Sequence, residues 1–158
     1  MLVETTRFGP IEVPDAKVIR MQKRILGFEH LETYCLVEQD GFHPFMWLQS
    51  VEDRDVAFIV VNPALFFADY RINVHYKEVG DLKIAALENV ETYVIVSVSG
   101  EPREVAVNLQ GPIVVNTENN FAKQLVLVNS DYKVCQRLMD ERDFDREEAR
   151  PVEEPVGV

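Results

Sequence analysis

Residues 90–99 read Val-Glu-Thr-Tyr-Val-Ile-Val-Ser-Val-Ser, and this stretch decides the fold class. Valine or threonine stands at every second position from Val90 to Val98. A period of two places alternate side chains on opposite faces of a strand, and β-branched residues pack well on a pleated surface. The stretch therefore predicts a long β-strand rather than a helix.

Shorter runs with the same alternation lie on both sides of this strand. They cover residues 2–7, 11–13, 34–38, 45–50, 56–61, 105–110, 113–115 and 124–128. Turn residues separate them, among them Gly111-Pro112 and Asn119-Asn120, and Asn62-Pro63 ends one run because proline has no N–H for a sheet. Eight or more short strands spaced by about ten residues are typical of a barrel or a sandwich. We therefore expect an all-β fold.

Helical signals are short and lie outside these runs. Residues 75–79 and 81–87 each predict one turn, the first ending at Gly80. A further helix is predicted from Asp131, which can cap it. The apolar residues at helical spacing behind this cap are Val134, Cys135, Leu138 and Met139.

The chain divides into a barrel domain, residues 1–139, and an acidic C-terminal tail, residues 140–158. The tail carries 8 acidic and 3 basic residues, and Phe144 is its only large apolar residue before Pro151 and Pro155. Such a composition cannot bury enough apolar surface to offset the entropy of ordering. We expect the tail to be a frayed helix or disordered.

Composition narrows the classes of function. The 158 residues carry a net charge of −11, which disfavours direct contact with nucleic acid or with anionic membranes. The start of the chain lacks the apolar run of a signal peptide, and Cys35 and Cys135 suit free thiols in a cytoplasmic protein. His30, His43 and His75 stand singly, so the sequence predicts no metal and no cofactor.

Two clusters invite a functional interpretation. Glu52, Asp53 and Asp55 lie between two predicted strands, where a solvated turn is favoured over the acid/base pair of a carboxylate-dependent hydrolase. The aromatic residues Phe66, Phe67 and Tyr70 follow Asn62-Pro63 and either cap the core or form an exposed protein-binding patch. No nucleophile elbow, phosphate-binding loop or dinucleotide fingerprint occurs.

Ordered sequence blocks resemble the flagellar assembly factor FliW family. They include residues 4–9, 11–14, 25–29, 44–51, 62–63, 107–109, 112–117 and 124–127. Departures fall in turns: Met21–Arg24 replaces a Phe-Pro-x-Gly segment, Phe121-Ala122 replaces a glycine turn, and Arg54 replaces a common proline.

The resemblance implies a small, largely antiparallel β-barrel-like domain and a regulator that is not an enzyme. It implies binding to CsrA, an RNA-binding translational repressor, and to flagellin, so that flagellin synthesis is coupled to flagellum assembly. The alternatives are a generic cytoplasmic β-barrel module with other partners and the carboxylate-dependent hydrolase.

A regulator that binds a basic protein should present acidic groups beside exposed apolar ones. Two segments offer this mixture and form the predicted protein-binding site. Its residues are Trp47, Gln49, Glu52, Asp53, Asp55, Phe66, Phe67, Asp69 and Tyr70.

Overall fold

The computed structural model describes residues 1–128 and 130–140, whose regular structure is strand with short 3₁₀ turns. The strands are β1 Leu2–Thr5, β2 Gly9–Glu12, β3 Ile19–Lys23, β4 Thr33–Val37, β5 Met46–Ser50, β6 Ala57–Val61, β7 Val90–Ser99, β8 Glu104–Val107, β9 Ile113–Asn116, β10 Phe121–Gln124 and β11 Gln136–Asp140. The 3₁₀ turns are η1 Asp15–Lys17, η2 Pro63–Leu65, η3 Tyr76–Glu78, η4 Gly80–Leu82 and η5 Leu87–Asn89.

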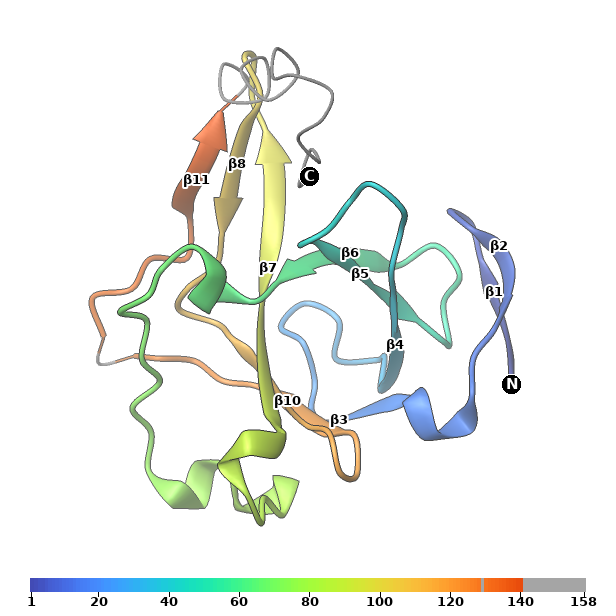
Figure 1. Ribbon diagram of the computed structural model, residues 1–158, viewed down its shortest axis with the longest axis horizontal. Helices are drawn as coiled ribbons and strands as arrows, with labels where there is room; N and C mark the ends of the chain where they lie inside the picture. Colours follow the sequence, from blue (N-terminus) through green and yellow to red (C-terminus); the bar gives the residue numbers. More distant parts are fainter. Residues whose placement is uncertain (129, 141–158) are drawn as a thin grey trace.

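Seven of the strands close into a barrel (Figure 1). Their order is β7-β6-β5-β4-β3-β10-β9, and β9 pairs again with β7. Only the β3–β10 pair within this ring is parallel. Closure leaves the ring without a free strand edge. The expected all-β, largely antiparallel barrel is confirmed.

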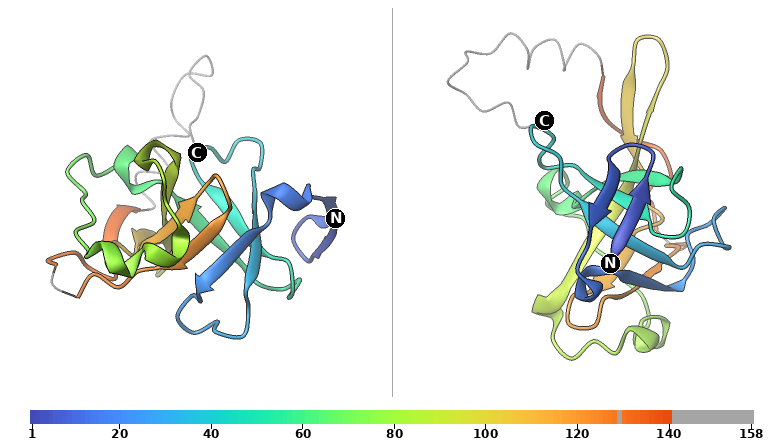
Figure 2. Two further views of the ribbon diagram at one scale, coloured as in Figure 1. Left: turned by 90° about the horizontal axis from the view of Figure 1, so that it is seen from below. Right: turned by 90° about the vertical axis from the view of Figure 1, so that its right-hand side faces the viewer.

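Strand β7 makes the closure possible because it is ten residues long. On one edge its residues 94–96 pair with β6. On the other edge, residues 90–93 pair with β9 and residues 96–99 pair with β8. The second half of β7 therefore leaves the ring with β8 and β11 as a projecting extension, while the β1–β2 hairpin lies on the other side of the barrel (Figures 1 and 2).

The connection between β3 and β4 covers one end of the barrel core. Ile25 and Leu31 in this connection are buried, and the Phe28 ring meets Phe58 edge-on, with 4.9 Å between ring centroids. The connection follows Lys23, the last residue of β3, and ends before Thr33, the first residue of β4. The opposite end of the barrel therefore lies beside Ile19 and Val37.

The expectation of a helix from Asp131 is wrong. Residues Gln136–Asp140 form strand β11, which pairs antiparallel with β8. Without β11, the outer edge of β8 would leave its backbone N–H and C=O groups unpaired. Pairing with this edge outweighs the local helical spacing, and it lets Leu138 pack against the core while Val134 stays 59% exposed. The predicted tail lies outside the described residues except for Asp140, the last residue of β11.

Three smaller differences concern strand positions and one glycine. The strand predicted at 124–128 begins earlier, as β10, although the amides of Leu125 and Leu127 still bond outward to Pro112 and Gln110 carbonyls at 2.8 Å each. Strand β3 was not predicted: Met21–Arg24 was expected in a turn, but the first three of these residues belong to this strand. The turns expected at 75–87 occur as η3 and η4, but the left-handed residue is Lys83 (φ 53°), and Gly80 starts the next turn.

Barrel closure predicts where the chain is sensitive to truncation. Ile113 lies on β9 opposite Tyr93 of β7 and is 1% exposed. Ile113→Ala should lower the free energy of unfolding by about 2–4 kcal/mol through lost burial and a cavity. Leu87→Ala removes the same number of carbon atoms at a site that is 84% exposed, so it should change the free energy of unfolding by less than about 0.5 kcal/mol. Urea denaturation measures both, and equal losses would contradict the closure.

Candidate functional site

The acidic segment between β5 and β6 is a hydrogen-bonded turn. The Ser50 hydroxyl accepts from the backbone amides of Glu52 and Asp53, at 3.2 and 2.9 Å. The Asp53 carboxylate accepts from the Asp55 amide at 3.0 Å. Short polar side chains that bond to the backbone two or three residues on are typical turn formers. The expectation of turn chemistry here is confirmed.

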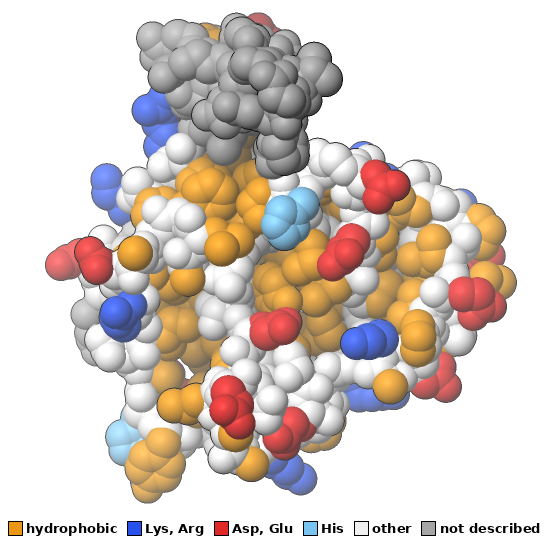
Figure 3. All heavy atoms as spheres, viewed as in Figure 1, with side chains coloured by type: hydrophobic (Ala, Val, Ile, Leu, Met, Phe, Trp, Pro, Cys, Tyr) orange, Lys and Arg blue, Asp and Glu red, His pale blue; other side chains and the backbone are white. Residues whose placement is uncertain are grey.

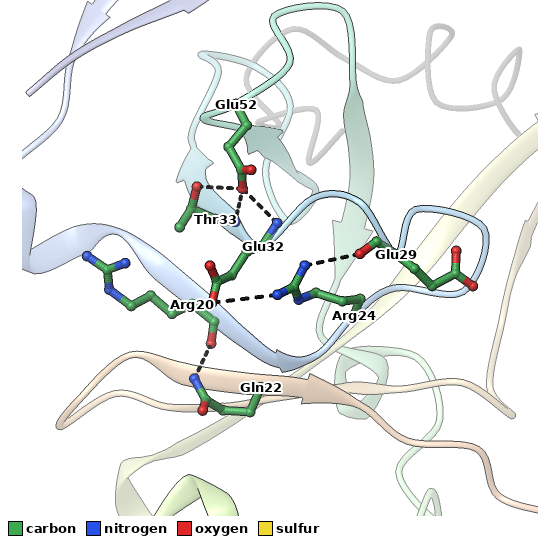
Figure 4. Close-up of polar contacts among 7 residues, drawn as sticks. All are labelled: Arg20, Gln22, Arg24, Glu29, Glu32, Thr33 and Glu52. Atoms are coloured by element: carbon green, nitrogen blue, oxygen red, sulfur yellow. Dashed lines mark hydrogen bonds and ion pairs between the residues drawn. The ribbon is translucent and has the colours of Figure 1, made fainter.

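Glu52 reaches out of this turn to the start of β4 (Figure 4). One of its carboxylate oxygens accepts from the amides of Glu32 and Thr33, at 2.6 and 2.7 Å, and from the Thr33 hydroxyl at 2.9 Å. Partial burial acts to raise the pKa of Glu52, but these hydrogen bonds outweigh it and lower the pKa below 4.5. Nearby Arg24 bonds to the Glu29 carbonyl and pairs with Glu32. Glu52 thus holds two strand connections together.

Asp55 points instead to the β1–β2 turn. It accepts a hydrogen bond from the Thr6 hydroxyl, and the Thr6 amide donates to the Arg54 carbonyl at 3.0 Å. Asp55 also lines a hollow of about 330 Å³ together with Arg7 and Arg54. Glu52 and Asp55 therefore serve different neighbours, and the turn does not gather its carboxylates into one acid/base site.

Trp47 lies at the start of β5 inside an aromatic cluster. The Arg7 guanidinium lies over its ring, 4.0 Å from the centroid, and Phe8 meets it edge-on. The indole N–H donates to Gln39 at 2.9 Å, and Trp47 is 8% exposed. Gln49 is fully buried, and its amide N–H group donates to the Ser50, Arg54 and Val56 carbonyls. Within this segment the acidic side chains, rather than Trp47 and Gln49, reach the surface.

The second predicted segment divides between core and surface. The Tyr70 hydroxyl donates to the Leu109 carbonyl at 2.6 Å, and Phe67 packs against the same buried cluster. Phe66 is 37% exposed, and Asp69 is exposed. Core capping thus accounts for Phe67 and Tyr70, and an exposed pair of one aromatic and one acidic residue remains.

The structure links the two segments through aromatic residues that sequence reasoning did not single out. Phe42 stacks on Trp47 with centroids 5.5 Å apart, and it contacts Phe45 at 5.7 Å. Phe45 stacks on Phe66 at 6.0 Å. The signal available in the sequence was the close spacing of Phe42, Phe45 and Trp47 around the start of the strand predicted over residues 45–50, but the link to Phe66 is long-range. The binding role of the nine predicted residues stays a prediction.

Neither a metal-binding cluster nor a membrane-spanning helix is found in the described part of the chain. Within residues 1–128 and 130–140, no three His, Cys, Asp or Glu side chains gather in a way that could hold a metal ion. No helix in the same residues is long and apolar enough to cross a membrane.

Together, the fold and the polar turns define a class of protein: a small β-barrel with a strand extension on one side and a hairpin on the other. The chain belongs to the FliW family, because the family model described as "FliW protein" matches residues 2–138. The predicted resemblance is therefore confirmed. It is a family of flagellar assembly factors.

Individual relatives cover nearly the whole chain. The flagellar assembly factor FliW of Syntrophus aciditrophicus is 37% identical over 144 residues, which are 91% of each chain. That of Clostridium beijerinckii is 36% identical over 84% of this chain and 94% of its own. A crystal structure of the flagellar assembly factor FliW superposes with a TM-score of 0.81 at 30% identity, covering 90% of this chain and 99% of the other.

The contacts of Glu52 predict a pH-dependent contribution to stability. Glu52→Gln should lower the free energy of unfolding at pH 7 by about 1 kcal/mol, because charge-assisted bonds weaken and the exposed site is screened. A lowered pKa in the folded state means that the charged carboxylate stabilises the fold above pH 4.5. That advantage should disappear as the pH falls further through the folded-state pKa.

Urea denaturation at pH 7 and at acidic pH measures this difference. Glu88→Gln, at an exposed carboxylate on η5, is the control and should show no difference at either pH. A Glu52→Gln loss that is the same at both pH values would contradict the role of the charged carboxylate.

Proposed function

We propose that this chain binds and antagonises the translational repressor CsrA, and that it also binds flagellin, so that flagellin synthesis follows flagellum assembly. The observation that carries the proposal is membership of the FliW family over residues 2–138. The binding of CsrA and flagellin is what the resemblance to that family implies.

The charge of the chain supports a basic protein as the partner. The net charge is −11, and the acidic turn carries the exposed side chains of Glu52 and Asp55 beside the partly exposed Asp53. Complementary charge speeds the encounter of two proteins, and apolar contacts at the centre of an interface hold them together. Phe66 and Asp69 offer both kinds of group on the neighbouring segment, linked to Trp47 through the stacked aromatic rings.

Antagonism should proceed without contact between this chain and RNA, because its charge repels the phosphate backbone. In an electrophoretic mobility assay, adding the protein to a CsrA–RNA complex should release free RNA. The protein alone should leave the RNA unshifted at physiological salt. A shift by the protein alone, or an unchanged CsrA–RNA complex at saturating protein, would overturn the proposal.

The acidic segments should speed association with CsrA. Asp53→Asn keeps an acceptor oxygen for the Asp55 amide, and Asp69→Asn changes an exposed residue, so each removes one charge with little effect on folding. Each variant should slow association roughly two- to three-fold and weaken its dependence on salt. Stopped-flow binding over a range of salt concentrations measures this.

Glu101→Gln is the matched control, because it removes one charge from the exposed β7–β8 turn, which belongs to neither segment. Its association rate should stay close to that of the unaltered protein. If all three variants slow association equally, only net charge matters and the docking surface lies elsewhere.

A further inference from the structure

The end of the barrel opposite the β3–β4 connection is open. A pocket of about 770 Å³ lies there, between the barrel strands and the segment that joins β2 to β3. Its apolar floor consists of core residues at this end of the barrel: Ile19, Leu36, Met46, Tyr93 and Val115. Figure 3 shows this face of the barrel, with hydrophobic side chains in a hollow and acidic side chains around it. We name this pocket the barrel mouth.

The polar rim of the barrel mouth is predominantly acidic. Glu12, Glu38 and Glu91 line it, and Lys17 is its only basic residue. Glu12 pairs with the amino group of Met1 at 3.5 Å. Neither Glu38 nor Glu91 pairs with a cation among the described residues, and Glu91 accepts a hydrogen bond from the Tyr93 hydroxyl. Two carboxylates thus line an apolar floor, and neither is paired with a cation from residues 1–128 or 130–140.

The arrangement of strands β4 and β7 places the carboxylates of Glu38 and Glu91 near the hydroxyl of Tyr93. Burial raises the pKa of the Tyr93 hydroxyl, and the Glu91 and Glu38 carboxylates raise it further. Glu38 directly follows β4, and Glu91 is the second residue of β7, so residues 53 positions apart in the sequence converge here. The negative charge is concentrated on one side of the mouth.

We propose that the barrel mouth receives a basic side chain, lysine or arginine, from a partner protein. Its aliphatic stem would pack on Leu36, Met46 and Tyr93, and its charged head would pair with Glu38 and Glu91. Lysine and arginine combine an apolar stem with a cationic head, which matches an apolar floor beside an acidic rim. A pocket of this volume is within the range that binds ligands, and it has room for an apolar neighbour of the basic residue as well.

The identity of the partner rests on the proposed function, since CsrA is the basic protein expected there. The preference of the pocket for a cation does not depend on which partner supplies it. Two measurements therefore test the cation site and the identity of the partner separately.

The first measurement uses a small probe, n-butylguanidinium, and its neutral counterpart, n-butylurea. In NMR titrations of the full chain, n-butylguanidinium should shift the methyl signals of Leu36 and Met46 in a saturable way, and n-butylurea should bind at least about three-fold more weakly. The double variant Glu38→Gln/Glu91→Gln keeps an acceptor for the Tyr93 hydroxyl and should abolish this preference. Lys17→Gln should strengthen binding of the cation.

The control variant Glu88→Gln/Glu101→Gln removes the same charge outside the mouth and should behave like the unaltered protein. Equal binding of both probes, shifts confined to other residues, or a preference that survives in Glu38→Gln/Glu91→Gln would overturn the proposed site.

The second measurement titrates CsrA. The Glu38→Gln/Glu91→Gln variant should bind CsrA roughly ten-fold more weakly than the control variant, as the loss of a partly enclosed charge pair predicts. If the unaltered protein binds CsrA and the variant binds it equally well, the proposed insertion is wrong and the proposed function stands. If the unaltered protein does not bind CsrA while the probe preference holds, the proposed function fails and the cation site stands with another basic partner.

Discussion

Strand β7 has to satisfy three neighbours with two edges, and the rest of the structure depends on how it does so. One edge pairs with β6, and the other is divided between β9 and β8. Ten residues are enough for this division, whereas the other strands have four or five. The β9 half closes the ring, and the β8 half becomes the extension that β11 completes.

Closure determines which surfaces the protein presents. Because the ring has no free edge, its loops and its ends carry the available chemistry. One end is covered by the β3–β4 connection, which Glu52 holds through the Glu32 and Thr33 amides. The other end keeps an apolar floor open to solvent beneath Glu38 and Glu91. Phe42 and Phe45 of the β4–β5 loop add a row of contacting rings that runs from Trp47 of β5 to Phe66, which follows η2.

The local sequence pattern predicted those elements in which the conformation that neighbouring residues favour is also the one that packing in the fold requires. The alternation at 90–99 predicted β7 because valine or threonine occupies every position on one face of that strand. The turn residues around Glu52 act within a few positions of one another. The helix expected from Asp131 was wrong because its residues satisfy the distant edge of β8, a demand that no local spacing reveals. The same reasoning explains the site: acidic Asp53 and Asp69 were visible in the sequence, but the meeting of Glu38 with Glu91 arises only from barrel closure.

Closure of the ring by the β7–β9 pair positions both ends of the barrel, and native-state hydrogen exchange tests this closure most directly. Amides of β9 and of the paired residues 90–93 should exchange only through global unfolding, with the same opening free energy as the ring strands β5 and β6. Amides of β8 and β11, outside the ring, should exchange at a lower opening free energy. If the β9 amides open as readily as those of β11 while β5 and β6 remain protected, the ring is not closed there and the account is contradicted.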